Sequence, residues 1–222
     1  MIKIIQLGDS FALERNAETM YVPRSFQFDG QAEKVAFMRR YPFATIITAA
    51  DGIPMATHLP FVLAENGVTI TLSSHFAAAN SQAMHIEGNT SLIIFSEPHA
   101  YISPSHYDKR ESVPTWDYIA VHAYGTCRMA DGVDAKLALL EKMIAVYEPE
   151  YRNQWDALPL QFKTGMLHGI VAFTLEVTDL QGQQKLSQNK TAAERTRIVQ
   201  QLEASPSGIE RDLATYIKKS LA

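Results

Sequence analysis

The feature that most constrains this sequence is a series of short β-rich runs between residues 43 and 128, each bounded by turn residues. Such a series is typical of a sheet or barrel and not of a helical bundle. The runs span residues 43–48, 55–63, 68–72, 91–95 and 119–127. Asp51-Gly52 and Asn66-Gly67 fall between successive runs, and both dipeptides suit the positive φ angles of tight hairpins. The pattern therefore predicts an antiparallel meander.

A further run at residues 171–178 alternates strictly between apolar and polar side chains. One face would carry Val171, Phe173, Leu175 and Val177, and the other Thr174, Glu176 and Thr178. This alternation predicts a strand with one buried and one wetter face. We expect it to join the same sheet, which favours one domain over two.

Helical periodicity is present at residues 32–40 and, more strongly, at residues 136–147. The second stretch carries an apolar stripe of Leu137, Leu140, Ile144 and Tyr147, so we expect it to cover an open side of the sheet. Near the end, Thr191–Glu194 and Ser207–Glu210 both have capping-box spacing. Two C-terminal helices are predicted to follow, separated by a break at residues 205–208.

Composition argues against a dedicated DNA-binding protein, a disulfide-bonded protein and a membrane-spanning protein. Of the 222 residues, 46% are hydrophobic, and the net charge of −4 lacks the basic excess of a dedicated duplex binder. The single cysteine, Cys127, excludes an intrachain disulfide and fits a reducing compartment, so we expect a cytoplasmic protein. No apolar run approaches the roughly 18 residues of a membrane span.

Common catalytic and metal-binding motifs are absent from the sequence. His58, His75, His99, His106 and His122 lie in the β-rich half, but without metal-ligand spacing, and most are interpreted as polar residues at strand ends. There is no nucleophile elbow, G-x-G-x-x-G sequence or P-loop. These absences remove the common hydrolase, Rossmann and kinase interpretations.

An aromatic, proline-rich segment covers residues 98–107 and 113–118. A stiff loop of this composition costs little entropy to order and offers planar faces with hydrogen-bonding edges. It suits a planar heteroaromatic ligand. An equally good interpretation is a rigid connection whose aromatic side chains cap the barrel.

Two segments could bind an anion. Residues 73–80 leave a strand and are predicted to open a short helix, where phosphate could bind; the alternative is an ordinary turn capped by Ser74. Residues 183–199 contain Lys185, Lys190, Arg195 and Arg197 against Glu194 alone. This segment could meet a cofactor phosphate, nucleic acid or only solvent, and the amide and hydroxyl donors beside Lys185 favour a small anionic ligand.

Seven blocks, in order along the chain, resemble the PaiB-like family of FMN-binding split-barrel proteins, also described as FMN-binding negative transcriptional regulators. The blocks are Met20–Pro23, Tyr41–Thr45, Ala56–Pro60, His99–Pro104, Val113–Trp116, Val121–Gly125 and Lys185–Asn189. The resemblance implies a mainly β fold with α-helices, a six-stranded antiparallel split β-barrel. It also implies a homodimer that binds two FMN molecules between its subunits.

The same resemblance implies which residues contact FMN. They are Thr57, His58, Leu59, Ser73, Ser74, His75, Asn80, Thr115, Trp116, Lys185, Ser187, Gln188 and Asn189. Groups near Ser74 and His75 would face the phosphate, Lys185 would offset its charge, and Trp116 would lie against the isoalloxazine ring. No catalytic residue and no metal ligand is assigned.

The sequence departs from the family pattern at three positions. Ala78 stands where relatives usually have arginine, Ser81 replaces a proline, and Asp117 replaces the asparagine of a W-N-Y block. Alanine cannot supply the bidentate phosphate contact of arginine. We divide the chain into an N-terminal extension (residues 1–19), an FMN-binding split barrel with its covering helix (20–190) and C-terminal helices (191–222).

Three functions fit this resemblance. The first is an FMN-dependent oxidoreductase or flavin reductase with a nicotinamide electron donor. The second is a flavin-sensing negative transcriptional regulator, although the sequence has no clear helix-turn-helix glycine and its net charge disfavours direct DNA binding. The third is a haem-binding or haem-degrading split barrel. We expect no membrane association.

Overall fold

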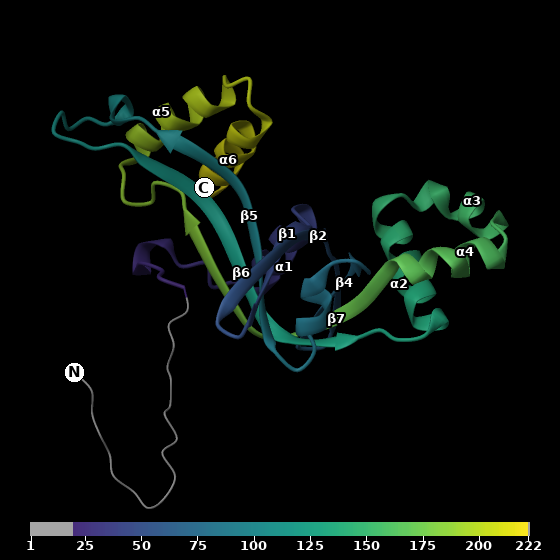
Figure 1. Cartoon of the computed structure of the whole chain (residues 1–222). Coiled ribbons are helices and arrows are strands. Elements are labelled where there is room, and N and C mark those ends of the chain that lie inside the picture. Colours follow the sequence, from purple (N-terminus) through teal and green to yellow (C-terminus); the bar gives the residue numbers. More distant parts are fainter. Residues whose placement is uncertain (1–19, 222) are drawn as a thin grey trace, which may run out of the picture.

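The computed structural model describes residues 20–221, which contain a seven-stranded antiparallel sheet flanked by helices (Figure 1). The strand order is β2-β1-β5-β6-β7-β4-β3. The strands are β1 (Phe43–Ala50), β2 (Ile53–Pro60), β3 (Val62–Asn66), β4 (Thr69–Ala77), β5 (Thr90–Ile102), β6 (Thr115–Met129) and β7 (Ile170–Lys185). The predicted fold class is confirmed, but the expected six strands are seven.

The additional strand arises because the run predicted at residues 55–63 is two strands. β2 ends at Pro60 and β3 begins at Val62, with the buried Phe61 between them. Pro60 has no amide donor, and the Phe61 amide donates to the carbonyl of Pro42 at 2.9 Å. Because β2 and β3 are the two edges of the sheet, this one-residue link brings the edges together. The Ser74 hydroxyl donates to the Pro60 carbonyl at 2.7 Å across the same corner.

The hairpin of β5 and β6 is longer than the runs at residues 91–95 and 119–127 predicted. Residues 98–102, expected to lie in a loop, belong to β5, with His99 opposite Tyr118 and Tyr101 opposite Trp116. The register shifts between Ser96 and His99, where Pro98 lacks an amide to pair. This part of the strand was not predicted, because its proline and polar aromatic residues are more typical of a loop.

The strand predicted at residues 171–178 is confirmed as part of β7, which lies between β6 and β4. Phe173 and Leu175 are fully buried, and Val171 and Val177 pack against the same core. The hairpin between β1 and β2 is also confirmed, since Asp51 and Gly52 have φ angles of 52° and 78°.

Four predicted helices are present, and two short ones were not predicted. The α-helices are α1 (Gln31–Arg40), α2 (Val133–Tyr147), α3 (Arg152–Ala157), α4 (Leu160–Met166), α5 (Ala192–Glu203) and α6 (Gly208–Lys219). Short 3-10 turns are η1 (Arg24–Phe26), η2 (Ser81–His85), η3 (Pro104–His106), η4 (Pro149–Tyr151) and η5 (Leu167–Gly169). In Figure 1, α2, α3 and α4 lie beside β4 and β7, and α5 and α6 lie at the far end of the long strands.

The helix predicted at residues 136–147 is confirmed as part of α2, and it lies against the sheet: the Tyr147 hydroxyl donates to the Phe61 carbonyl at 2.8 Å. Leu139 is its buried residue, whereas the predicted stripe residues are only partly buried and Tyr147 is exposed. Lys136 donates to the carbonyls of Leu167 and Ile170, at 3.2 and 2.8 Å. The α2 helix is therefore fastened to the start of β7, and it also packs against α3 and α4.

One of the two predicted capping boxes is confirmed. At the start of α5, the Glu194 amide donates to Thr191 Oγ1 at 3.2 Å, and the Thr191 amide donates to Glu194 Oε2 at 2.8 Å. At the start of α6, the Ser207 side chain makes no capping hydrogen bond, so that prediction is wrong. The division of the chain at residues 20 and 191 stays a prediction, and the predicted extension lies outside the described residues.

Candidate functional site

The predicted FMN-contacting residues fall into two groups. The hairpin group comes from the start of β6 and the end of β7: Thr115, Trp116, Lys185, Ser187, Gln188 and Asn189. The edge group comes from β2, β4 and the turn into η2: Thr57, His58, Leu59, Ser73, Ser74, His75 and Asn80.

Aromatic side chains line one face of the long hairpin. Trp116 is 53% exposed, and its ring centroid lies 6.0 Å from those of both His99 and Tyr101. Tyr118 follows on the same face of β6 and donates to Gln183 at 2.9 Å. We call His99, Tyr101, Trp116 and Tyr118 the aromatic face. It offers a ligand exposed planar surface on strands, where the sequence predicted a loop.

Lys185 lies beside this aromatic face, because it is paired with Tyr118 across β6 and β7. Its ammonium donates to Thr115 Oγ1 and lies 5.8 Å from the centroid of the Phe26 ring. The side chain is half-buried. A cation is thus held next to exposed aromatic rings.

The chain after β7 turns sharply at Ser187, whose φ of 55° is in the left-handed region. Its hydroxyl donates to Asp117 Oδ2 at 2.6 Å. Gln188 accepts from the Leu186 amide at 2.7 Å and donates to the Gln184 carbonyl at 2.6 Å. Ser187 and Gln188 therefore use their side chains to shape the loop, and Asn189 is left exposed.

Asp117 is a residue of this site that the predicted list missed. It is fully buried beneath the hairpin group, and burial raises its pKa to about 6, although the Ser187 hydrogen bond and the charges of Lys185 and Arg195 oppose the shift. Within residues 20–221, its Oδ1 has no hydrogen-bond partner. The sequence held one signal for it. Side chains alternate along a strand, so a residue next to the exposed Trp116 is expected on the opposite, buried face.

The predicted basic segment is mostly engaged within the fold. Arg195 donates to the Ile217 carbonyl at 3.3 Å and to Ser220, and so binds the end of α6. Arg197 donates to the His106 carbonyl at 2.8 Å and to Asp108 at 2.5 Å. Lys190 Nζ lies 3.6 Å from the centroid of the Tyr107 ring. Of the four cations, Lys185 is the one beside the aromatic face.

In the edge group, Thr57 and Asn80 belong to a hydrogen-bond network that fastens η2 to the sheet. Asn80 Nδ2 donates to Thr57 Oγ1 at 2.9 Å, and Thr57 donates to Gln82 Oε1 at 2.6 Å. Asn80 also caps η2 by accepting from the Gln82 amide at 2.9 Å. The predicted helix start is therefore capped by Asn80 and not by Ser74. The Gln82 amide, which could have bound a phosphate, donates to the Asn80 side chain instead.

Neighbouring strand residues of the edge group point to opposite faces. Leu59 belongs to the core, whereas His58 is exposed and its Nδ1 lies 2.8 Å from Thr45 Oγ1. Ser74 is fully buried, while His75 is half-buried with a pKa lowered by burial. The side chains of His58 and His75 can therefore meet a ligand, and those of Leu59 and Ser74 cannot.

One chain does not bring the two groups together. Ser74 pairs with Phe173 near the start of β7, while Tyr118 pairs with Lys185 at its end. These positions are twelve residues apart, which is roughly 40 Å along an extended strand. His58 belongs to the same end of β7 as Ser74, because its neighbour Thr57 accepts from Asn80, which follows the end of β4 that pairs with the start of β7.

Comparison with known proteins identifies the family. The model of the family described as "Putative FMN-binding domain" matches residues 20–179. The chain belongs to this FMN-binding family. A curated relative, "Protease synthase and sporulation protein PAI 2" of Bacillus subtilis, is 35% identical over 205 residues, covering 91% of this chain and 98% of the relative. These findings confirm the PaiB-like resemblance and FMN as the family's cofactor.

Solved structures confirm the fold of this FMN-binding family member. The flavocytochrome Anf3 of Azotobacter vinelandii has a TM-score of 0.58 at 14% identity, over 76% of this chain and 74% of that one. The FAD and heme binding protein of Mycobacterium smegmatis has a TM-score of 0.58 at 15% identity, over 77% and 78%. At such identities the likeness extends to the fold alone.

The hairpin group fits the chemistry of FMN. The aromatic face supplies exposed rings for a flat, polarisable ring system, and Lys185 supplies a cation for a phosphate. Ala78 is exposed in the edge group, so no arginine stands at the position where the family pattern has one. Among residues 20–221 there is no cluster of three or more potential metal ligands, and no helix is long and apolar enough to span a membrane.

Proposed function

We propose that this chain is a homodimeric FMN-dependent oxidoreductase of the flavin reductase type, with each flavin bound between two subunits. The observation that carries the proposal is the separation of the two predicted groups along β7. A site that uses both groups needs the hairpin group of one subunit and the edge group of another. The cytoplasmic location and the nicotinamide donor expected from the sequence are part of the proposal.

A half-buried apolar sheet face supports the dimer. Ile47, Leu92 and Tyr124 are aligned across β1, β5 and β6, with Ile94 and His122 in the next row. They lie on the face opposite the core residues Ile46, Ile93 and Val121, which are fully buried. A second subunit that covers this face would remove apolar surface from water.

In the proposed site, the aromatic face would contact the isoalloxazine ring and Lys185 would neutralise the phosphate. The His58 and His75 side chains of the second subunit would close the cleft and exclude water. Bound FMN would supply hydride and single-electron transfer. The protein's own contribution is then to bind the cofactor, orient it and leave one face open to a donor.

Spectroscopy tests cofactor binding. The purified protein is expected to take up added FMN with a change in the flavin absorption, and Trp116→Ala and Lys185→Ala are each expected to weaken binding by about tenfold or more. Lys190→Ala is the matched control for Lys185→Ala, because its ammonium lies over the ring of Tyr107, which is not part of the aromatic face. Equal affinities for all four proteins would show that the placement of the site is wrong.

Anaerobic reduction separates an oxidoreductase from a flavin-binding regulator. With FMN bound, NADH or NADPH is expected to bleach the flavin absorption within seconds to minutes. A stable oxidised spectrum would instead favour the regulator. Since the Arg195 and Arg197 side chains are engaged within the fold, direct binding of promoter DNA is expected to be weak even at low salt.

A further inference from the structure

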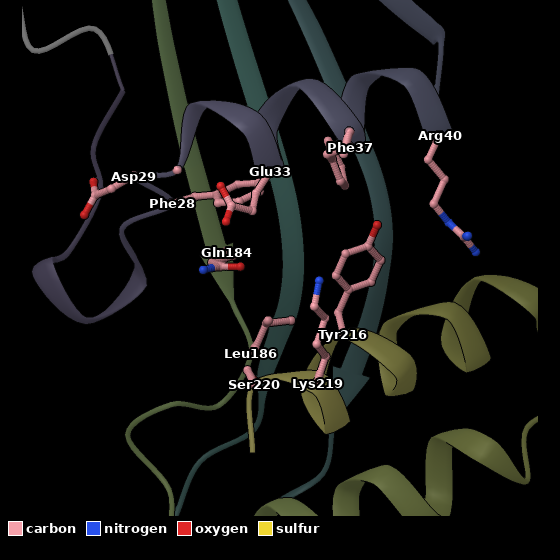
Figure 2. Close-up of a pocket in the computed structure, with 12 residues that line it drawn as sticks. Phe28, Asp29, Glu33, Phe37, Arg40, Gln184, Leu186, Tyr216, Lys219 and Ser220 are labelled. Atoms are coloured by element: carbon pink, nitrogen blue, oxygen red, sulfur yellow. The ribbon is translucent and has the colours of Figure 1, made fainter. Parts of the chain in front are cut away.

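A cavity lies on the other side of the strand end that carries Lys185. It has a volume of about 450 Å³, is lined by α1, α6 and the end of β7, and is open to solvent on one side (Figure 2). Gln184 and Leu186 line it, and Lys185 between them points to the opposite face of the strand. This cavity is therefore separate from the proposed flavin site.

The walls of the cavity are largely apolar and aromatic. Phe28, Phe37 and Leu186 are buried core residues, and the half-buried Tyr216 completes the wall. The Phe37 and Tyr216 ring centroids are 6.3 Å apart, with the rings inclined at 68°. Volume and lining are within the range of small-molecule sites, and the rings suit a flat ligand.

Charged groups are ordered along the cavity. Glu33 lies near the start of α1 and Arg40 at its end, and the Lys219 side chain rises from α6 between them, beside Tyr216 (Figure 2). Glu33, Phe37 and Arg40 share one face of α1 because they are four and seven positions apart. Seven residues of helix span roughly 10 Å. The cavity thus has an acidic end at Glu33 and basic groups at Lys219 and Arg40, with the Phe37 and Tyr216 rings beside them.

Of the two cations that line the cavity, Arg40 is paired among the residues that the structure describes and Lys219 is not. Arg40 donates to Asp212 at 2.8 Å and to the Tyr41 hydroxyl at 2.9 Å. Within residues 20–221, the Lys219 ammonium has no hydrogen bond or ion pair, and it points toward Tyr216 in Figure 2. The neighbouring Lys218, in contrast, is paired with Glu203 at 3.0 Å.

The acidic end offers acceptors, and Gln184 adds an amide. The Glu33 carboxylate folds back over Gly30, so close that a Cβ at Gly30 would come within 1.8 Å of Oε2. It is therefore held at the start of its own helix, where the helix dipole favours it. The Gln184 side-chain amide lies near this end and has no partner within the described part of the chain.

We propose that this cavity binds a small planar aromatic acid whose far end carries a hydrogen-bond donor. Lys219 binds the carboxylate, the Phe37 and Tyr216 rings contact the aromatic ring, and Glu33 with Gln184 accepts from the donor. A benzene ring that carries a carboxylate and an amine at opposite positions has both of these groups. A second carboxylate would instead face Glu33 and be repelled.

The test uses 4-aminobenzoate as the probe and isothermal titration calorimetry of the full-length protein. Saturable binding with one site per chain is expected. Lys219→Gln should weaken it by about tenfold or more, whereas Lys218→Gln, with the same change in net charge on the same helix, should change it less than about twofold. Ala36→Phe, which fills the cavity from α1, should abolish binding while FMN uptake is unchanged.

Chemical variants of the probe test each end of the site. Aniline, which lacks the carboxylate, should bind weakly and be insensitive to Lys219→Gln, and terephthalate should bind more weakly than 4-aminobenzoate. No saturable binding of 4-aminobenzoate at millimolar concentration, or equal losses in the two lysine variants, would overturn the proposal. Displacement of the probe by FMN would also overturn it, because the cavity would then belong to the flavin site.

Discussion

At the scale of single residues, Asp117 has a measurable consequence for stability. Because burial raises its pKa to about 6 in the folded state, against 3.8 for the ordinary side chain, folding favours its neutral form. The stability that this group contributes is fully present below pH 3.8 and is lost as the pH rises through about 6. A shift of about two pKa units corresponds to about 3 kcal/mol.

Asp117→Asn should therefore stabilise the protein at neutral pH and leave it nearly unchanged at pH 4. The asparagine stays neutral and can still accept from the Ser187 hydroxyl. Urea unfolding at several pH values between 4 and 7.5 should show the advantage of the variant growing to about 2–3 kcal/mol. The exposed Asp156, whose pKa is lowered by its bond to Arg152, is the control: Asp156→Asn should show no such gain. A difference that is constant with pH would contradict the prediction.

The structure places Lys185 beside the exposed Trp116, two residues that the sequence singled out, and their contact with FMN stays a prediction. No local pattern in the sequence indicated which polar side chains have hydroxyls that bond within the fold. Ser74 and Ser187 donate to Pro60 and Asp117, and their partners are 14 and 70 positions away in the sequence. Only the register of distant strands brings such partners together, so local spacing does not distinguish a ligand-binding hydroxyl from a structural one.

At the scale of elements, the bulge between β6 and β7 depends on one glycine. The register shifts between Tyr124 and Gly125. A Cβ at Gly125 would lie 2.1 Å from the Glu176 carbonyl oxygen and 2.6 Å from Leu175 Cδ2. Because the first of these atoms is backbone, a side chain would force the two central strands apart.

Gly125→Ala is accordingly expected to lower the free energy of unfolding by about 1–3 kcal/mol. Gly165→Ala is the matched control, since nothing lies within 4 Å of a Cβ there and the position is inside α4. Alanine in a helix should be neutral or stabilise by up to about 1 kcal/mol. Thermal unfolding of the two variants compares them, and a Gly125→Ala protein as stable as wild type would refute this view of the bulge.

The elements predicted from the sequence are those with a strong period or a local signal. The alternation of β7 and the capping box of α5 are examples, since neighbouring residues determine both. The break at Phe61 and the length of β5 were not predictable, because they depend on Pro42 and on β6, which are distant in sequence. Helices α3 and α4 have six and seven residues, too few to establish a helical period.

At the scale of the whole molecule, the two separated groups distinguish a shared site from a site within one chain. We expect Trp116→Ala/Lys185→Ala to damage the hairpin group and His58→Ala/His75→Ala to damage the edge group. If each flavin contacts the hairpin group of one subunit and the edge group of the other, both variant homodimers should fail to bind FMN. A mixed dimer then distinguishes a shared site from a site within one chain.

In a mixed dimer with one subunit of each variant, one interface site receives both damaged groups and the other receives two intact ones. Co-expression with two different affinity tags allows this dimer to be isolated, and it should bind one FMN where wild type binds two. A site contained within a single chain would be damaged in both subunits, so the mixed dimer would bind none. The flavin stoichiometry, measured by absorption after gel filtration, therefore decides whether the two groups, which lie near opposite ends of β7, are brought together by a second subunit.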